Sequence, residues 1–230
     1  MDNIKIKRRI CDVLLLLCIA VITFLIGKIF VNQWKYKAGK EYESLRKAVQ
    51  TKQGIDWKKL KKINGDIVAW IKIPGTKINY PVVQAKNNED YLHKTFSGKY
   101  NSSGCIFLDS GCKNDFSSDN SIIYGHHMRN GSMFAALVKY KERSFWKKHQ
   151  EILLYKPDET RVLKVLGANA NKPQKLPIQF KNKQEREKYS SMIQKYSYVG
   201  NKKIDKRIYT FVTCSYEKND YRTYVYAIDK

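Results

Sequence analysis

A long apolar stretch lies near the start of the chain, over residues 10–31. Its 22 residues contain only two charged side chains, Asp12 near the beginning and Lys28 near the end. At about 1.5 Å per residue, a helix of this length spans roughly 33 Å, close to the hydrocarbon thickness of a bilayer. The pattern predicts one transmembrane helix over residues 10–31.

Basic residues in front of this stretch indicate its orientation. Residues 1–9 hold four of them: Lys5, Lys7, Arg8 and Arg9. Because positive charge stays on the cytoplasmic side, we expect a cytoplasmic tail over residues 1–9 and the rest of the chain outside the cell. A cleaved signal peptide would need small residues where Phe30 and Val31 stand, and a lipoprotein would need one in place of Leu17, before Cys18. An uncleaved anchor is therefore favoured.

After the anchor, apolar residues recur at helical intervals in a polar background. This pattern predicts an extracellular stalk and helix over residues 32–54. Gly54 interrupts the periodicity, and Asp56 can cap a second short helix that ends near Ile63. We expect both helices to pack on the main domain, which we assign to residues 55–230.

From residue 67 onward, short apolar segments alternate with turn residues, which is typical of β-strands. Eight such segments are present: residues 67–73, 80–83, 106–108, 121–124, 152–155, 162–168, 207–213 and 222–228. They predict a mainly β fold, an eight-stranded barrel that is closed or nearly closed. We expect one helix to begin at Ser132 as its N-cap and another to span residues 185–196, between the sixth and seventh strands.

Composition narrows the class of protein. The 230 residues suffice for one ordinary domain with accessories, and a hydrophobic content of 43% excludes a wholly disordered chain. Five cysteines, an odd number, do not form a disulfide scaffold. Cys105 and Cys112 could still form one bridge outside the cell or remain free thiols, and both interpretations stay open.

Positive charge dominates the chain. The formal net charge is +23, and the part beyond Lys28 holds 39 basic and 19 acidic residues. This excess favours anionic neighbours such as membrane lipids and wall polymers, although a solvated basic surface is the simpler interpretation. Nucleic acid is not expected as a partner, because the lysines are spread along the chain and the topology puts them outside the cell.

A cysteine at the end of a predicted strand is the first candidate for chemistry. Cys214 ends the seventh strand, and a short polar turn separates it from the eighth, which begins at Arg222. If the two strands fold back as a hairpin, Arg222 can lie beside Cys214. A guanidinium there can lower the pKa of the thiol and donate hydrogen bonds to an oxyanion. On its own, such a pair is more often structural than catalytic.

Two of the four histidines also lie at a strand end. His126 and His127 follow Gly125 at the end of the fourth strand, where side chains face solvent or a cleft. A cysteine nucleophile needs a partner that can protonate a leaving amine, and histidine is the usual one. Adjacent histidines point apart and have no ligand at metal-binding spacing nearby, so we expect neither a metal nor another cofactor.

Several motifs together carry a resemblance to a known family. Thr210–Cys214, with Arg222 eight residues on, resembles the sortase signature Thr-Leu-x-Thr-Cys, and the segment Tyr-Gly-His-His-Met is similar to the histidine segment of that family. Three further sequence segments resemble class B sortases in particular: residues 68–83, 104–109 and 130–134. The resemblance extends from about residue 55 to the end of the chain, with the motifs in the same order.

This resemblance implies a membrane-anchored cysteine transpeptidase on the outer face of a Gram-positive cell. Cys214 would attack the carbonyl after the Thr of a secreted protein's C-terminal sorting signal, of the Asn-Pro-x-Thr type, and form a thioester. His126, which directly follows the glycine, would protonate the leaving amine, and Arg222 would stabilise the oxyanion. An amine of a peptidoglycan precursor or wall peptide would then take over the acyl group.

The resemblance also implies substrate contacts. Asn88 and Leu92, one helical turn apart, match positions that line the class B groove, and Tyr124 and Thr213 flank the catalytic pair. Phe211 replaces the signature Leu and Val212 stands where class B members often carry Ser. A pilin-polymerising or hydrolytic relative and a non-catalytic, membrane-anchored module that binds wall polymers are the alternatives.

Overall fold

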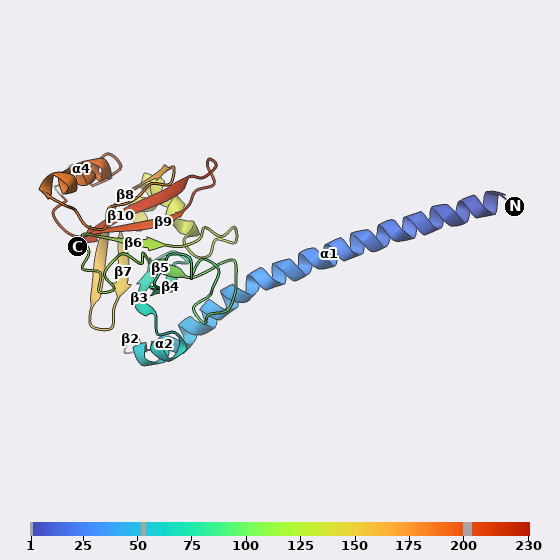
Figure 1. The fold of residues 1–230 in the computed structure, drawn as a ribbon, viewed down its shortest axis with the longest axis horizontal. Helices are drawn as coiled ribbons and strands as arrows, with labels where there is room; N and C mark the ends of the chain where they lie inside the picture. The colour runs from blue at the N-terminus through green and yellow to red at the C-terminus, as the bar shows by residue number, and fades with distance from the viewer. Residues whose placement is uncertain (1, 52–53, 200–203) are drawn as a thin grey trace. The chain divides into compact units, whose positions relative to one another are not determined.

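The computed structural model describes residues 2–51, 54–199 and 204–230. It divides into two compact units, the first ending at Glu41 and the second covering Tyr42–Lys230. The first unit is the N-terminal part of helix α1 (Asp2–Val49), drawn in blue in Figure 1. Its segment Ile10–Ile29 has a mean hydropathy of 2.8 and is long and apolar enough to cross a membrane. It is therefore a candidate membrane span at the predicted position.

The second unit begins with the last turns of α1, where Tyr42, Leu45 and Val49 are buried. The helix ends at Val49, earlier than the predicted boundary at residue 54, because the chain turns there into a two-residue ladder of β1 (Gln50–Thr51) with β2 (Gly54–Ile55). Helix α2 (Trp57–Ile63) follows, and the side chain of Asp56 accepts a hydrogen bond from the Lys59 N–H at 2.9 Å. This confirms Asp56 as the predicted cap.

All eight predicted strands are present and form one closed barrel. They are β3 (Ile67–Lys72), β4 (Asn79–Val83), β5 (Ile106–Leu108), β6 (Asn120–Tyr124), β7 (Glu151–Tyr155), β8 (Thr160–Asn171), β9 (Ile208–Cys214) and β10 (Arg222–Asp229). Around the barrel the order is β10-β8-β7-β3-β4-β5-β6-β9. The pairs β4–β5 and β6–β9 are parallel and the others antiparallel. The mainly β fold expected from the sequence is confirmed.

The helix expected to begin at Ser132 is wrong in position and type. Ser132 does not cap a helix, because its hydroxyl bonds the side chain of Asn130 and Met133 adopts a φ of +54°. A 3₁₀ helix, η1 (Ala135–Lys141), follows and leads into the short helix α3 (Arg143–Lys148). Both lie between β6 and β7.

The helix between the sixth and seventh barrel strands is present as α4 (Lys183–Gln194). It begins two residues earlier than predicted because Asn182 caps it, accepting from the Glu185 N–H at 2.9 Å. Tyr189 and Met192 contact Thr210 and Tyr226 on one face of the β9–β10 hairpin. The helix thus covers this face at one end of the hairpin, and a pocket lies on the same face at the other end, near Cys214.

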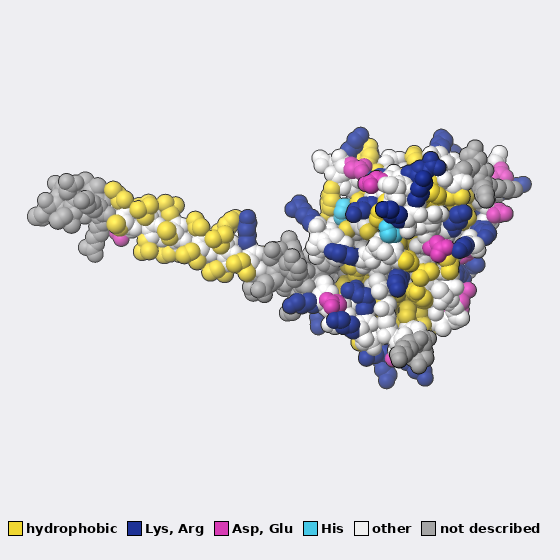
Figure 2. All heavy atoms as spheres, turned by 180° about the vertical axis from the view of Figure 1, so that it is seen from behind, with side chains coloured by type: hydrophobic (Ala, Val, Ile, Leu, Met, Phe, Trp, Pro, Cys, Tyr) yellow, Lys and Arg dark blue, Asp and Glu magenta, His cyan; other side chains and the backbone are white. Residues whose placement is uncertain are grey.

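Charged side chains do not gather in a single patch on the face shown in Figure 2. Lys and Arg side chains are scattered there among uncharged and acidic ones. On this face of the second unit, Tyr42–Lys230, the distribution is that of a solvated basic surface.

Candidate active site

The register of four neighbouring strands builds the floor of a pocket. Phe107 on β5 is opposite Tyr124 on β6, Tyr124 is opposite Val212 on β9, and Val212 is opposite Tyr224 on β10. Residues in register across a sheet present their side chains on the same face. The four residues therefore form one apolar and aromatic row across the sheet.

The next row on the same face holds the three residues that the sequence predicts to be catalytic. Two residues beyond Val212 is Cys214, and two before Tyr224 is its cross-strand partner Arg222. On the neighbouring parallel strand, His126 lies two residues beyond Tyr124, and the ladder still continues there because the Gly125 N–H donates to the Val212 carbonyl at 3.1 Å. Strand periodicity thus brings three residues that are far apart in the sequence to one edge of the barrel.

Arg222 and Cys214 are close as well as opposite. The Ser215 N–H donates to the Tyr221 carbonyl at 2.8 Å, so the neighbouring pair carries the ladder hydrogen bond. Cys214 and Arg222 then form a non-hydrogen-bonded pair, the type in which the two side chains approach most closely. The hairpin expected from the sequence therefore has the register that places Arg222 directly opposite Cys214, with both side chains on the pocket face.

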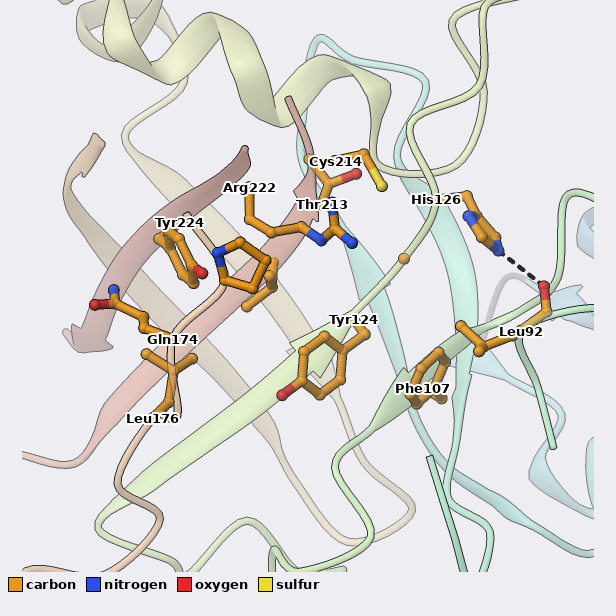
Figure 3. Close-up of a pocket in the computed structure, with 13 residues that line it drawn as sticks. Leu92, Phe107, Tyr124, His126, Gln174, Leu176, Thr213, Cys214, Arg222 and Tyr224 are labelled. Atoms are coloured by element: carbon orange, nitrogen blue, oxygen red, sulfur yellow. Dashed lines mark hydrogen bonds between the residues drawn. The ribbon is translucent and has the colours of Figure 1, made fainter. Parts of the chain in front are cut away.

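Both rows line one pocket of about 440 Å³ (Figure 3). The lining residues come from β5, β6, β9, β10 and three connecting segments: Leu92, Phe107, Tyr124, Gly125, His126, Pro173, Gln174, Leu176, Val212, Thr213, Cys214, Arg222 and Tyr224. Six of the seven residues predicted from the sequence lie in this set. The exception is Asn88.

A backbone carbonyl orients His126. Its Nε2 lies 2.8 Å from the carbonyl oxygen of Leu92, and because that oxygen can only accept, Nε2 carries the proton. In the neutral ring, Nδ1 then holds the lone pair that can take a thiol proton. Figure 3 shows Nε2 turned away from the Cys214 sulfur, toward Leu92. The Leu92 carbonyl can orient this ring as a carboxylate orients the histidine in a Ser-His-Asp triad.

The surroundings of His126 favour its neutral form. Burial lowers the pKa of the imidazole below 6.5, and the positive charges of His93 and Arg222 lower it further, against the hydrogen bond to Leu92, which raises it. At neutral pH the ring is therefore available as a base.

Leu92 reaches the pocket from a loop, so the expected helical turn from Asn88 to Leu92 is wrong. The segment consists of bends and turns, with the Leu92 N–H donating to the Glu89 carbonyl at 3.1 Å. The Asn88 side chain is used elsewhere, because it donates to the Asp109 carboxylate at 3.0 Å and accepts from the Ser110 N–H at 2.8 Å. Asp109 also accepts from the Tyr124 hydroxyl at 3.1 Å. Asn88 thus contacts the pocket only through Asp109 and Tyr124.

Comparison with known proteins agrees with this geometry. Residues 71–229 match the sequence model of the Sortase domain. The chain belongs to the sortase family. Sortase B of Staphylococcus aureus (strain NCTC 8325 / PS 47) is 30% identical over 215 residues, which cover 89% of this chain and 88% of that protein.

Two solved sortase B structures extend the comparison. The X-ray structure of Clostridium perfringens sortase B has a TM-score of 0.71 and 33% identity, covering 76% of this chain and all of the other. A Staphylococcus aureus sortase B–substrate complex has a TM-score of 0.74 and 29% identity, covering 84% and 96%. The class B resemblance is confirmed. The protein is therefore an enzyme, a sortase-type cysteine transpeptidase, and the alternative of a non-catalytic binding module is excluded.

The second histidine, His127, contacts the backbone of Cys214 and is not part of the pocket lining. The Nδ1–H of His127 donates to the backbone carbonyl of Cys214 at 3.0 Å, and its ring packs on Tyr216 at a centroid distance of 4.7 Å. The Tyr216 hydroxyl donates back to the His127 carbonyl at 2.8 Å. Because neighbouring side chains point apart, His126 enters the pocket while His127 holds the backbone beside the thiol.

Sequence reasoning missed part of the pocket wall. Phe107 could have been found by extending the strand register from Tyr124, since both carry aromatic rings at paired positions. Pro173, Gln174 and Leu176 lie in the connection between β8 and α4, where no periodic pattern indicates which side chains turn inward.

The remaining cysteines of the catalytic unit are separate. Cys105 and Cys112 are both buried, and no disulfide joins them. Burial raises the pKa of Cys112 to about 11, and its sulfur accepts from the Ile122 N–H at 3.4 Å. Within residues 2–51, 54–199 and 204–230, no three His, Cys, Asp or Glu side chains converge on a point that could hold a metal ion.

Proposed function

We propose that this sortase cleaves the C-terminal sorting signal of secreted proteins and transfers them to an amine of the cell wall. The Cys214 sulfur attacks the carbonyl carbon after the Thr of the signal. Nδ1 of His126 accepts the thiol proton and passes it to the nitrogen of the leaving peptide as the C–N bond breaks. A thioester between Cys214 and the carboxyl-terminal Thr of the secreted protein remains.

The second half of the reaction reverses these roles. An amine of a peptidoglycan precursor or wall peptide attacks the thioester carbon, and His126 takes a proton from it. The C–S bond breaks, the thiolate regains a proton, and a new amide joins the protein to the wall. In both halves Arg222 donates hydrogen bonds to the oxygen on which negative charge develops.

The observation that carries this proposal is the single pocket lined by Cys214, His126 and Arg222. Its aromatic and apolar floor suits an extended peptide with an apolar side chain and a proline ring. An Asn-Pro-x-Thr type of signal follows from the class B resemblance, and a sortase B relative has been solved with its substrate. Leu92 and Tyr124 would contact the signal directly, Thr213 would contact it through its backbone, and Asn88 would act through Asp109.

The location proposed for this reaction is the outer surface of the membrane. Residues 10–31 would be the anchor, with residues 1–9 in the cytoplasm, a stalk over residues 32–54 and the catalytic domain at residues 55–230 outside. Support comes from the apolar segment Ile10–Ile29 and from the basic residues in front of it. Anionic membrane lipids would then be neighbours of the basic catalytic domain.

The test uses the full chain in detergent with quenched fluorescent Asn-Pro-x-Thr and Leu-Pro-x-Thr peptides. We expect cleavage after Thr by the wild type, no cleavage by Cys214→Ala, and capture of added triglycine on the new Thr carboxyl group. Equal melting temperatures of the two proteins would show that the variant is folded. Cleavage without amine capture would favour a hydrolytic relative, and silence of the folded wild type on both peptides would contradict the proposal.

A further inference from the structure

The ring of His93 is stacked on that of His126. The two centroids lie 6.0 Å apart, with an angle of 21° between the planes. Tyr100 also packs against His93, at a centroid distance of 6.0 Å and a tilt of 40°. His93 is exposed, and the reaction proposed above gives it no function.

His93 immediately follows Leu92, whose carbonyl receives the Nε2–H of His126. One dipeptide therefore restrains the imidazole in two directions. The carbonyl fixes the rotation of the ring within its plane, and the stacked ring limits the tilt of that plane.

The loop that carries this dipeptide is itself well fixed. The Asn101 N–H donates to the His93 carbonyl at 2.8 Å, and the Cys105 N–H donates to the Tyr91 carbonyl at 3.0 Å. Hydrogen bonds on both sides of Leu92 and His93 keep the backbone from shifting when the ring is exchanged. A substitution at position 93 consequently tests the ring rather than the loop.

We propose that His93 is a positioning residue for His126, whose ring it holds by stacking. The proposal rests on the proposed function for the consequence in catalysis, but the contact between the two rings is independent of that function.

The charged and titratable groups around His126 come from three parts of the chain. His93 belongs to the loop, Arg222 to β10, and Cys214 faces the ring from the end of β9. Tyr100 is a further titratable group, and its ring packs at a tilt against His93. Because the His93 variants leave Arg222 and position 214 unchanged, a difference in the His126 midpoint between them and their background is attributable to position 93.

The experiment compares His93→Phe, which keeps a ring without a charge, with His93→Gln, which has neither. The matched control is Lys94→Gln, which removes a neighbouring positive charge and no ring contact. Peptide cleavage by the full chain is followed from pH 5 to pH 9. In parallel, the imidazole of His126 is titrated by NMR in the Cys214→Ala background, a reading that needs no catalysis.

We expect His93→Gln to lower kcat about tenfold, with KM within about twofold of the wild type, because the ring loses its orientation. His93→Phe should retain kcat at pH 7.5 within about twofold, since it preserves the stack. In both variants the titration midpoint of His126 should rise, and added salt should reduce the difference from the wild type. Lys94→Gln should match the wild type.

Three results would overturn the proposal. One is a His93→Gln enzyme with wild-type kcat, and another is a His93→Phe enzyme as impaired as His93→Gln. The third is a His126 midpoint that does not move in either variant. If the wild type proves inactive on every peptide, the NMR titration still decides whether the two rings are coupled.

Discussion

Gly104 tests whether the Leu92 carbonyl positions His126. The glycine has a φ of +56°, and a Cβ added there would lie 2.5 Å from the Leu92 carbonyl oxygen and 2.6 Å from that of Tyr91. Since non-bonded contacts of this kind need at least about 3.0 Å, the Leu92 oxygen would have to move by roughly 0.5 Å or more. The same oxygen accepts the 2.8 Å hydrogen bond from His126.

We expect Gly104→Ala to lower kcat about 10- to 100-fold, since displacements approaching 1 Å near the reacting groups have effects of this size. The left-handed conformation and the overlap together should reduce the free energy of unfolding by about 2–3 kcal/mol. For a unit of this size that corresponds to a Tm lower by roughly 5–10 °C. The assays are peptide cleavage at saturating substrate and thermal unfolding followed by circular dichroism.

Gly98 is the matched control for this substitution. It lies in the same loop with a φ of +81°, but a Cβ there would have no heavy atom within 4 Å. Gly98→Ala should therefore lower the free energy of unfolding, because alanine is strained at this positive φ, and should leave kcat unchanged. Wild-type kcat in Gly104→Ala, or an equal loss in both variants, would refute the argument that the Leu92 carbonyl positions the histidine.

Three further predictions concern protonation and thiol reactivity. Burial lowers the pKa of His126, so its neutral form persists below pH 6.5. When kcat/KM is measured from pH 5 to pH 9, it should fall only below pH 6.5. A fall on the acid side that begins above pH 6.5 would contradict the burial of His126. With Cys11 and Cys18 of the N-terminal helix replaced by serine, iodoacetamide at pH 7.5 should modify Cys214 and not buried Cys112, whose pKa is raised to about 11. Peptide mapping by mass spectrometry would detect the opposite result. Hydrogen bonds from Lys156 and Arg161 lower the pKa of Glu159 to about 2, and the ionised carboxylate therefore stabilises the fold above pH 4.5. The wild type should have a higher Tm than Glu159→Gln at neutral pH, and this difference should disappear between pH 4.5 and pH 2. A difference in Tm that persists at pH 2 would disprove this linkage.

The barrel was predictable because its strands are short apolar segments between turn residues. All eight were placed within a few residues, and the closed order of the barrel adds pairings that no local pattern contains. The helix expected at Ser132 failed for a local reason. The Ser132 hydroxyl donates to the side chain of Asn130 instead of capping a helix. Because Met133 has a positive φ, the helix begins only at Ala135.

For the candidate site, sequence and structure agree where strand periodicity determines position. Cys214 and Arg222 follow from alternation along a hairpin, and His126 follows from a strand end after a glycine. Asn88 and Leu92 lie in a loop, where spacing in the sequence does not determine direction. The Asn88 amide was drawn to Asp109, an interaction between residues 21 positions apart that only the folded chain brings together.

The orientation of His126 therefore depends on backbone groups that extend well beyond the pocket. Leu92 supplies the carbonyl, and Gly104 allows that carbonyl its position by lacking a side chain. The Gly104 carbonyl accepts in turn from the buried hydroxyl of Tyr42 at 2.7 Å, in the last turns of α1. Because the catalytic unit begins at Tyr42, the end of this helix is part of the framework that positions the histidine, and shortening the chain past Tyr42 should impair catalysis as well as stability.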